Sequence, residues 1–355
     1  MKIVVFETEP RETSFFEPLK GLHDLVFIDP PLRSENADRY ADAEIVSTFI
    51  YSELDAGVLE RLPALRLIAT RSTGFDHIDT DYCAAHGIAV SNVPSYGENT
   101  VAEHVFALLL ALSRRLPEAM DRARHGQFSP QGLQGFDLAG KTLGVVGTGA
   151  IGRRVIRIAN GFGMETIAFD VDPDPDLAKD LGFRYIGFDE LLSASDVITL
   201  HVPSRPETRH ILSTQAFARM KDGVVVINTA RGDLIDTRAL IQALTSGKVA
   251  AAGLDVLPDE PLIREEAELI CSIFCDRHDL RDLVANHVLL RMQNVIVTPH
   301  SAFNTLEAVD RIVETTVENI GAFLAGAPRN VVAGSSMPTV EPAEDATARG
   351  TRRGS

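Results

Sequence analysis

The chain has 355 residues, of which 45% are hydrophobic and 24% charged, and it is long enough to form two globular domains with separate cores. Its formal net charge of −16 at pH 7 argues against a nucleic-acid-binding surface, because phosphate binding needs a basic face. The most apolar run, residues 105–112, is too short to span a bilayer.

The N-terminus and the cysteines predict the cellular compartment. Residues 1–6 run directly into a strand pattern and lack the layout of a signal peptide. The three cysteines, Cys83, Cys271 and Cys275, cannot build a disulfide framework, which suits a reducing cytosol. We therefore predict a cytoplasmic protein that binds neither membrane nor nucleic acid.

The first hundred residues alternate short β-rich runs with helical stretches, which favours a parallel α/β sheet. The expected strands are 3–6, 25–28, 44–48, 66–69 and 88–91. A loop at 92–97 precedes an expected helix over 101–115, with Asn99 or Thr100 as its N-cap. That helix is apolar on nearly every side, so it is either fully buried or part of a subunit interface. We expect it to form the interface of a homodimer.

A second series of strands follows at 142–146, 166–170, 197–202, 223–228, 250–255 and 295–298. Helical stretches separate most of them, as a doubly wound sheet requires. Prolines stand just beyond several strand ends, where such sheets bind ligands. An amphipathic helix is expected over 304–325, and the polar tail from residue 333 to 355 is expected to be disordered.

A glycine motif links the second series to a nucleotide. Gly147, Gly149 and Gly152 directly follow an expected strand and open an expected helix. In such a motif the first glycine permits a tight turn, the second lets the backbone approach a pyrophosphate, and the third allows helix and sheet to pack closely. Asp170 closes the next strand, where a carboxylate accepts hydrogen bonds from ribose hydroxyls and repels a 2′-phosphate. NAD is therefore expected over NADP.

Several further motifs resemble the D-isomer-specific 2-hydroxyacid dehydrogenase family over residues 1–332. They are Gly147–Gly152, Leu200-His201-Val202-Pro203, Asn228-Thr229-Ala230-Arg231-Gly232, Leu254-Asp255-Val256 with Glu260, and Thr298-Pro299-His300. Within that family, Arg71-Ser72-Thr73-Gly74-Phe75-Asp76 and Phe303 most resemble the D-lactate dehydrogenase branch.

The resemblance implies an α/β fold with two doubly wound parallel-sheet domains. A Rossmann NAD-binding domain (100–301) is inserted into a smaller, flavodoxin-like substrate domain (1–99 and 302–332). The implied cofactor contacts come from Gly147, Gly149, Ala150, Ile151, Gly152, Asp170, Val202, Pro203, Thr208, Thr229, Ala230, Arg231 and Asp255. The implied substrate contacts come from Tyr51, Thr73, Gly74, Arg231, His300 and Phe303.

The implied catalytic residues are Arg231, Glu260 and His300, and the chemistry supports each. An arginine can grip a substrate carboxylate with two parallel hydrogen bonds. A histidine can serve as acid in one direction and base in the other, since its charge changes near neutral pH. Glu260 is expected to orient the imidazole and favour its protonated form.

A helical insert over 263–290 lengthens the chain between Glu260 and His300. Within it, Cys271 and Cys275 lie one helical turn apart, near His278. This spacing fits a metal site but also an apolar helix face. We expect no bound metal.

The sequence thus predicts an NAD-dependent oxidoreductase that interconverts small D-2-hydroxy acids and 2-oxo acids of the D-lactate and pyruvate type. One alternative is an NAD-sensing regulatory or scaffold protein on the same fold, because a fold does not imply turnover. Another is a dehydrogenase of formate or phosphite type.

Overall fold

The computed structural model describes residues 1–258 and 280–333. Of the expected tail, Ala333 lies in a short strand, so its predicted disorder was wrong, and residues 334–355 lie outside the described residues. The chain divides into two compact units. Unit 1 comprises Met1–Tyr96 and the chain from Val309 onward, and unit 2 is Gly97–Ala308. The divisions therefore follow Tyr96 and Ala308, whereas the sequence analysis placed them after residues 99 and 301.

Unit 1 is built on a six-stranded sheet with the order β13-β5-β4-β3-β1-β2. Five strands are parallel, and β13 pairs antiparallel with β5. The strands span β1 Lys2–Phe6, β2 Asp24–Ile28, β3 Ile45–Thr48, β4 Leu67–Thr70, β5 Ala89–Ser91 and β13 Val331–Ala333. The carboxyl ends of the parallel strands therefore lie along one edge of this sheet.

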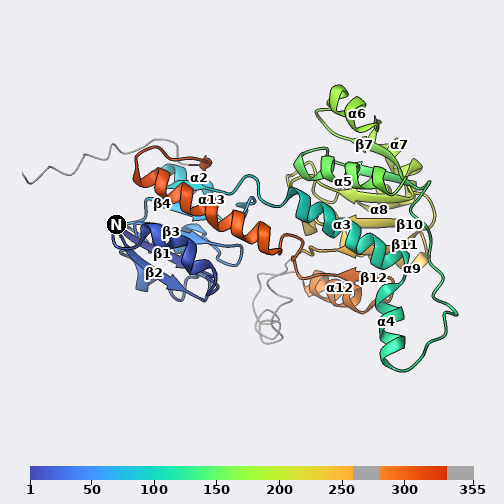
Figure 1. Cartoon of the computed structure of the whole chain (residues 1–355), viewed down its shortest axis with the longest axis horizontal. Helices are drawn as coiled ribbons and strands as arrows, with labels where there is room; N and C mark the ends of the chain where they lie inside the picture. Colours follow the sequence, from blue (N-terminus) through green and yellow to red (C-terminus); the bar gives the residue numbers. More distant parts are fainter. Residues whose placement is uncertain (259–279, 334–355) are drawn as a thin grey trace, which may run out of the picture. The chain divides into compact units, whose positions relative to one another are not determined.

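Side chains alternate along each strand, so successive residues point to opposite faces of the sheet. Each face is covered by a hydrophobic core. Val4 and Val46 point to a core shared with Leu59 and Cys83. Their strand neighbours enter a second core with Phe16 and with α13, which returns from the C-terminal part of the chain (Figure 1). The covering elements are η1 Glu12–Leu19, η2 Ala37–Tyr40, α1 Ala56–Leu59, α2 Thr80–Ala85 and α13 Leu306–Leu324.

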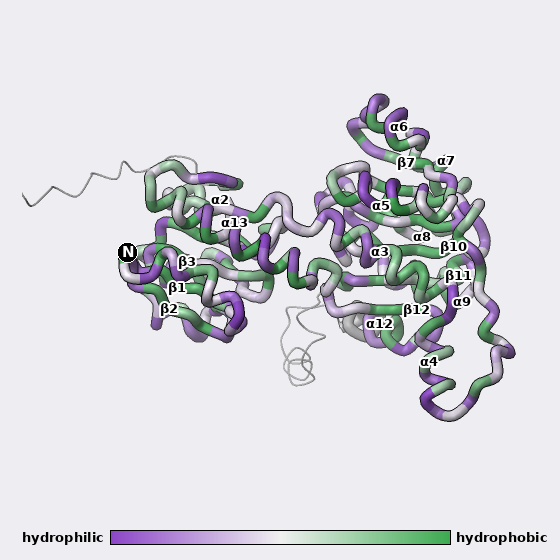
Figure 2. The backbone as a smooth tube through the Cα atoms, in the orientation of Figure 1, coloured by the Kyte–Doolittle hydropathy of each residue, from purple (hydrophilic) through white to green (hydrophobic). Residues whose placement is uncertain are grey.

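Unit 2 is built on a seven-stranded parallel sheet with the order β12-β11-β10-β9-β6-β7-β8. The strands span β6 Thr142–Val146, β7 Glu165–Phe169, β8 Arg184–Tyr185, β9 Val197–Leu200, β10 Val224–Asn228, β11 Val249–Leu254 and β12 Val295–Val297. Figure 2 shows hydrophobic residues concentrated along the central strands, as expected for strands buried on both faces.

Two hydrophobic cores flank this sheet. One contains Val145 and Ile227 with residues of α3 Glu98–Ser113 and α5 Ala150–Gly161. The other contains Val146 and Val226 with residues of α7 Phe188–Ala194, α8 Thr214–Arg219, α9 Thr237–Ser246 and α12 Leu280–Arg291. The remaining elements are α4 Leu116–Arg124, α6 Pro175–Leu181 and η3 Gly232–Leu234.

The predicted fold class is confirmed, with local corrections. The sequence patterns did not predict β8 and β13, two short strands at sheet edges. The N-cap of α3 is Gly97, which makes no side-chain cap, so the prediction of Asn99 or Thr100 was wrong. The helix begins at Glu98, so Asn99 and Thr100 already lie within its first turn.

In the described part of the chain, no helix is long and apolar enough to cross a membrane. The cytoplasmic location stays a prediction.

The buried amide of Asn319, on α13, joins three segments of unit 1. Its Nδ2 donates to the Asn92 carbonyl at 2.9 Å, and its Oδ1 accepts from Asn330 at 2.8 Å. Asn319→Ala should lower the free energy of unfolding by about 1–3 kcal/mol, because buried polar partners lose their hydrogen bonds. Urea unfolding followed by circular dichroism measures this. The exposed neighbour Glu318→Ala is the control, and equal midpoints for the two variants would contradict the prediction.

Candidate active site

The turn between β6 and α5 contains three glycines. Packing within the protein requires Gly147 and Gly152 to be glycine, whereas Gly149 faces open space. Gly147 has φ +95°, and a Cβ there would lie 2.6 Å from the His201 carbonyl oxygen. A Cβ on Gly152 would lie 2.1 Å from the Gly147 oxygen. A Cβ on Gly149 would meet nothing within 4 Å. The middle glycine therefore leaves the backbone open to a ligand. It lies next to the N–H groups of Ala150 and Ile151 at the start of α5, which donate to no acceptor in the described part of the chain.

Asp170, directly after β7, is fastened to this turn. Its Oδ2 accepts from the Thr148 N–H at 2.7 Å and from the Thr148 hydroxyl at 2.9 Å. Burial raises the pKa of Asp170, but the hydrogen bonds led by the Thr148 N–H lower it further, and the net shift is downward. Asp170 is therefore held as a carboxylate beside the glycine turn.

Sequence reasoning missed Tyr185, from edge strand β8. Its hydroxyl lies 2.8 Å from Thr148 Oγ1, so Tyr185, Thr148 and Asp170 form one hydrogen-bonded chain. A strand of two residues carries too little periodicity to be detected in the sequence.

The loop after β9 also reaches the glycine turn. Val202 Cγ1 would lie 2.9 Å from a Cβ on Gly147. The Thr208 hydroxyl donates to the Pro203 carbonyl at 2.7 Å and accepts from the Arg205 N–H at 2.9 Å. Thr208 thus fixes the shape of this loop.

Arg231 follows β10 in a loop that Asn228 organises. Asn228 Nδ2 donates to the Arg231 carbonyl at 2.8 Å, and its Oδ1 accepts from the Ala230 N–H at 3.0 Å. A Cβ on Gly232 would lie 2.2 Å from the Leu257 carbonyl carbon. This loop therefore packs directly against the segment that follows β11.

The loop that carries His300 is built around the side chain of Asp255, which is 1% exposed. Its carboxylate accepts from the Thr298 hydroxyl and from the N–H groups of Ser301 and Ala302, both at 2.9 Å. The main-chain oxygen of Asp255 accepts from the His300 N–H at 2.9 Å. His300 itself is half-buried, with φ +50°.

His104, on α3, is a second residue that sequence reasoning missed. Its Nε2 lies 3.0 Å from Thr298 Oγ1 and 3.4 Å from Asp255 Oδ1. Burial raises the pKa of Asp255, while hydrogen bonds led by that from His104 lower it, with a net downward shift. In the sequence, His104 is only one polar residue within an apolar helix.

Two sequence expectations concern residues outside the described part of the chain. The first is the pairing of Glu260 with His300, which stays a prediction. The second is the spacing of Cys271, Cys275 and His278. Among residues 1–258 and 280–333, no group of three or more His, Cys, Asp or Glu side chains is placed to hold a metal.

Unit 1 holds three of the expected substrate residues, Tyr51, Thr73 and Gly74, at the carboxyl edge of its sheet, whereas Phe303 lies in unit 2. The Thr73 hydroxyl donates to the Val93 carbonyl, and the Thr73 carbonyl accepts from Asn92. Within the described residues, the N–H groups of Thr73 and Gly74 donate to no protein acceptor. Tyr51 follows β3, is 36% exposed, and packs edge-to-face on Phe49 at 5.8 Å.

These features fit a dinucleotide in unit 2. Gly149 gives a diphosphate room to approach, and the Asp170 carboxylate suits ribose hydroxyls. The buried Thr229 hydroxyl, beside Arg231, has no hydrogen-bond partner among the described residues, and a ligand or water often completes such a group. When bound, a nicotinamide supplies a hydride donor or acceptor.

Comparison with known proteins identifies the class. Residues 106–302 match the family described as D-isomer specific 2-hydroxyacid dehydrogenase, NAD binding domain. The chain belongs to the D-isomer-specific 2-hydroxyacid dehydrogenase family and is an NAD-dependent 2-hydroxyacid dehydrogenase.

Individual relatives cover nearly the whole chain. The D-lactate dehydrogenase of Escherichia coli K12 is 37% identical over 327 residues, which are 90% of this chain and 96% of that protein. A glyoxylate reductase of Korarchaeum cryptofilum is 35% identical over 308 residues, 85% of this chain and 86% of its own. The crystal structure of D-lactate dehydrogenase from Aquifex aeolicus, complexed with NAD and lactic acid, has a TM-score of 0.81 at 38% identity. It covers 92% of this chain and 96% of its own.

Because Asp170 is held as a carboxylate, we predict that the protein prefers NADH to NADPH. Asp170→Ser should raise the Michaelis constant for NADH and lower that for NADPH, because ribose acceptors are lost and a charge opposite the 2′-phosphate is removed. Steady-state kinetics with both cofactors measures the change. Asp189→Ser, on the exposed side of α7, is the control. Equal use of NADH and NADPH by the unmodified protein would refute this role of Asp170.

Proposed function

We propose that this protein reduces pyruvate-like 2-oxo acids to D-2-hydroxy acids with NADH and catalyses the reverse oxidation with NAD. The observation that carries the proposal is the clamp on the His300 loop, which places a histidine beside a buried, ionised Asp255 at the carboxyl edge of the NAD-binding sheet. The likeness to D-lactate dehydrogenases supports lactate-type substrates.

The proposed substrate contacts are those that the family resemblance implies. In unit 2, Arg231 binds the substrate carboxylate through its guanidinium and stabilises the charge that develops on the reacting oxygen. The N–H groups of Thr73 and Gly74, in unit 1, are also proposed as carboxylate donors. Tyr51 and Phe303 contact the substrate side chain.

His300 donates a proton to the carbonyl oxygen during reduction and accepts it back during oxidation. Glu260 orients the imidazole and favours its charged form. Asp255 holds the loop so that the histidine keeps one position throughout the cycle.

Glyoxylate is the second candidate substrate, because two glyoxylate reductases are 34–35% identical to this chain. A panel of pyruvate, glyoxylate and 2-oxobutyrate, followed by NADH absorbance, ranks the candidates. If the protein binds NADH but turns over none of them, the alternative of an NAD-sensing protein is favoured instead. Turnover of formate or phosphite with NAD would favour the other alternative.

The acid–base role of His300 is tested by His300→Ala. Turnover of the best 2-oxo acid should fall by roughly two to four orders of magnitude, the usual contribution of a positioned general acid. The dissociation constant of NADH, measured by fluorescence, should stay within about two-fold, since His300 belongs to the acid–base step. The exposed His86→Ala is the control. Near-normal reduction by the His300 variant would refute the mechanism.

We also propose that the protein is a homodimer, although the reason differs from the sequence argument. Most of the apolar surface of α3 is buried within unit 2 itself. The arm that follows, residues 114–137, contains no buried residue. It returns to α3 where the Phe136 N–H donates to the Ser113 carbonyl at 3.0 Å.

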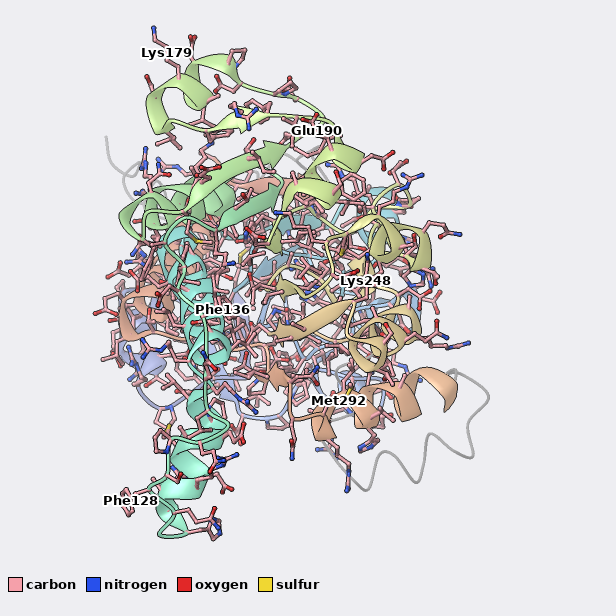
Figure 3. All side chains as sticks on the ribbon, turned by 90° about the vertical axis from the view of Figure 1, so that its right-hand side faces the viewer. Phe128, Phe136, Lys179, Glu190, Lys248 and Met292 are labelled. Atoms are coloured by element: carbon pink, nitrogen blue, oxygen red, sulfur yellow. The ribbon has the colours of Figure 1, made fainter. Side chains whose placement is uncertain are left out.

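The arm nevertheless carries large apolar side chains. Leu116 is 45% exposed, Met120 53% and Phe128 84%. Figure 3 shows Phe128 at the far end of the arm, away from the body of unit 2. A pocket of about 550 Å³ opens at the base of the arm, between Leu112, Phe136 and Val295. Exposed apolar side chains on this arm favour association with a second copy of the chain.

The double variant Met120→Lys, Phe128→Asp should be monomeric, because it places charges where the proposed interface excludes water. Light scattering coupled to size-exclusion chromatography measures the mass. Leu22→Asp, at an 80% exposed site in unit 1, is the control and should remain dimeric. A stable monomer of the unmodified protein at micromolar concentration would refute the proposal.

A further inference from the structure

A carboxylate in unit 1, that of Glu7 directly after β1, collects hydrogen bonds from one distant segment. Its Oε2 accepts from the backbone N–H of Phe49, its carboxylate also accepts from the N–H of Tyr51, and its Oε1 accepts from the Ser52 hydroxyl at 3.1 Å. The segment 49–52 follows β3, which pairs with β1. One side chain of β1 therefore fixes the backbone of the loop that leaves the neighbouring strand.

The orientation of Glu7 is itself fixed by Arg71, which is 2% exposed. Arg71 Nη2 donates to the carbonyls of Phe6 at 2.8 Å and Glu7 at 2.6 Å. The Arg71 N–H donates to the Thr48 carbonyl at 2.7 Å. Glu7 has φ +55°, a left-handed conformation that a non-glycine residue adopts only where its surroundings hold it. Arg71 supplies that support and joins the ends of β1, β3 and β4.

The segment held by Glu7 carries Tyr51. The Tyr51 N–H binds Glu7 directly, and its ring packs on Phe49, whose N–H binds the same carboxylate. The Ser52 hydroxyl in turn accepts from the Leu32 N–H at 2.9 Å. Removing the carboxylate would release the backbone on both sides of the Tyr51 side chain.

We propose that Glu7 is a positioning residue that sets the place of Tyr51 and thereby the preference of the enzyme among 2-oxo acids of different side-chain size. This inference rests on the proposed function, in which Tyr51 contacts the substrate side chain. Glu7 does not touch the substrate. It acts through the loop, so its loss changes selectivity rather than the acid–base step.

Glu12 offers a matched control. It is also buried, at 8% exposure, and its Oε2 lies 3.9 Å from Arg71 Nη2. It accepts instead from the Glu9 N–H, beside its own helix, at 3.3 Å. Glu12→Gln therefore removes a comparable buried charge near Arg71 without touching the segment 49–52.

The first experiment compares Glu7→Gln with Glu12→Gln. For each, kcat/KM is measured with pyruvate and with the larger 2-oxoisocaproate. Glu7→Gln should change the ratio of the two values by about five-fold or more, the scale of a lost hydrogen bond to a charged group. Glu12→Gln should leave the ratio within about two-fold, and both should keep the KM for NADH. Ser52→Ala, which removes one of the three bonds, should shift the ratio in the same direction by less.

A double-mutant cycle tests whether Glu7 acts through Tyr51. In a Tyr51→Ala background, Glu7→Gln should no longer change the substrate ratio, because the side chain that it positions is absent. An equal change in both backgrounds would overturn the inference. So would an unchanged ratio in Glu7→Gln alone.

Hydrogen–deuterium exchange separates this inference from the proposed function, because it needs no substrate. Backbone exchange at Phe49 and Tyr51 should accelerate at least ten-fold in Glu7→Gln and stay unchanged in Glu12→Gln, since Glu7 accepts from these two N–H groups whereas Glu12 accepts from the Glu9 N–H. Unchanged exchange in Glu7→Gln overturns the positioning role whatever the enzyme reduces. If exchange accelerates but the protein reduces no 2-oxo acid, the proposed function is refuted, and so is the role of Glu7 in selectivity. Glu7 would then only stabilise the backbone of the segment 49–52.

Discussion

The geometry of the candidate catalytic loop depends on the buried carboxylate of Asp255. His300 has a left-handed backbone conformation, which costs about 1–2 kcal/mol for a residue with a Cβ. The hydrogen bonds from Ser301 and Ala302 to Asp255 offset that cost. Because the folded pKa of Asp255 is lowered, its ionised form contributes stability above the unfolded pKa. That contribution is lost only as the pH falls through the lowered value.

The parallel sheet of unit 2 explains how motifs far apart in sequence form one site. The glycine turn, the Val202 loop, Arg231 and Asp255 follow β6, β9, β10 and β11, which are neighbours in the sheet. Parallel strands place their carboxyl ends at the same edge, so each motif needs only to follow its strand directly. This is why the fold class, most strand positions and the location of the cofactor turn could be predicted from the sequence.

The contacts that sequence reasoning missed share a physical cause. Tyr185 and His104 reach the site through side chains from other elements, and their partners lie 37 and 194 residues away. No periodicity encodes such a pairing. The strands β8 and β13 are two and three residues long, too short for an alternating pattern. The Gly97 cap of α3 lacks the side-chain oxygen by which helix starts are usually detected.

Three carboxylates each hold a loop that leaves another strand: Asp170 holds Thr148, Asp255 holds the His300 loop, and Glu7 holds the segment 49–52. A carboxylate suits this task because it accepts several N–H groups at once. Glu7 differs in one respect. Burial raises its pKa despite the opposing influence of Arg71, so its ionised form costs folding free energy above that pKa, and the cost disappears below the unfolded value. A charge kept at a cost in stability is typical of a functional site rather than of a core. The energetics of Glu7 therefore agree with a role in placing Tyr51.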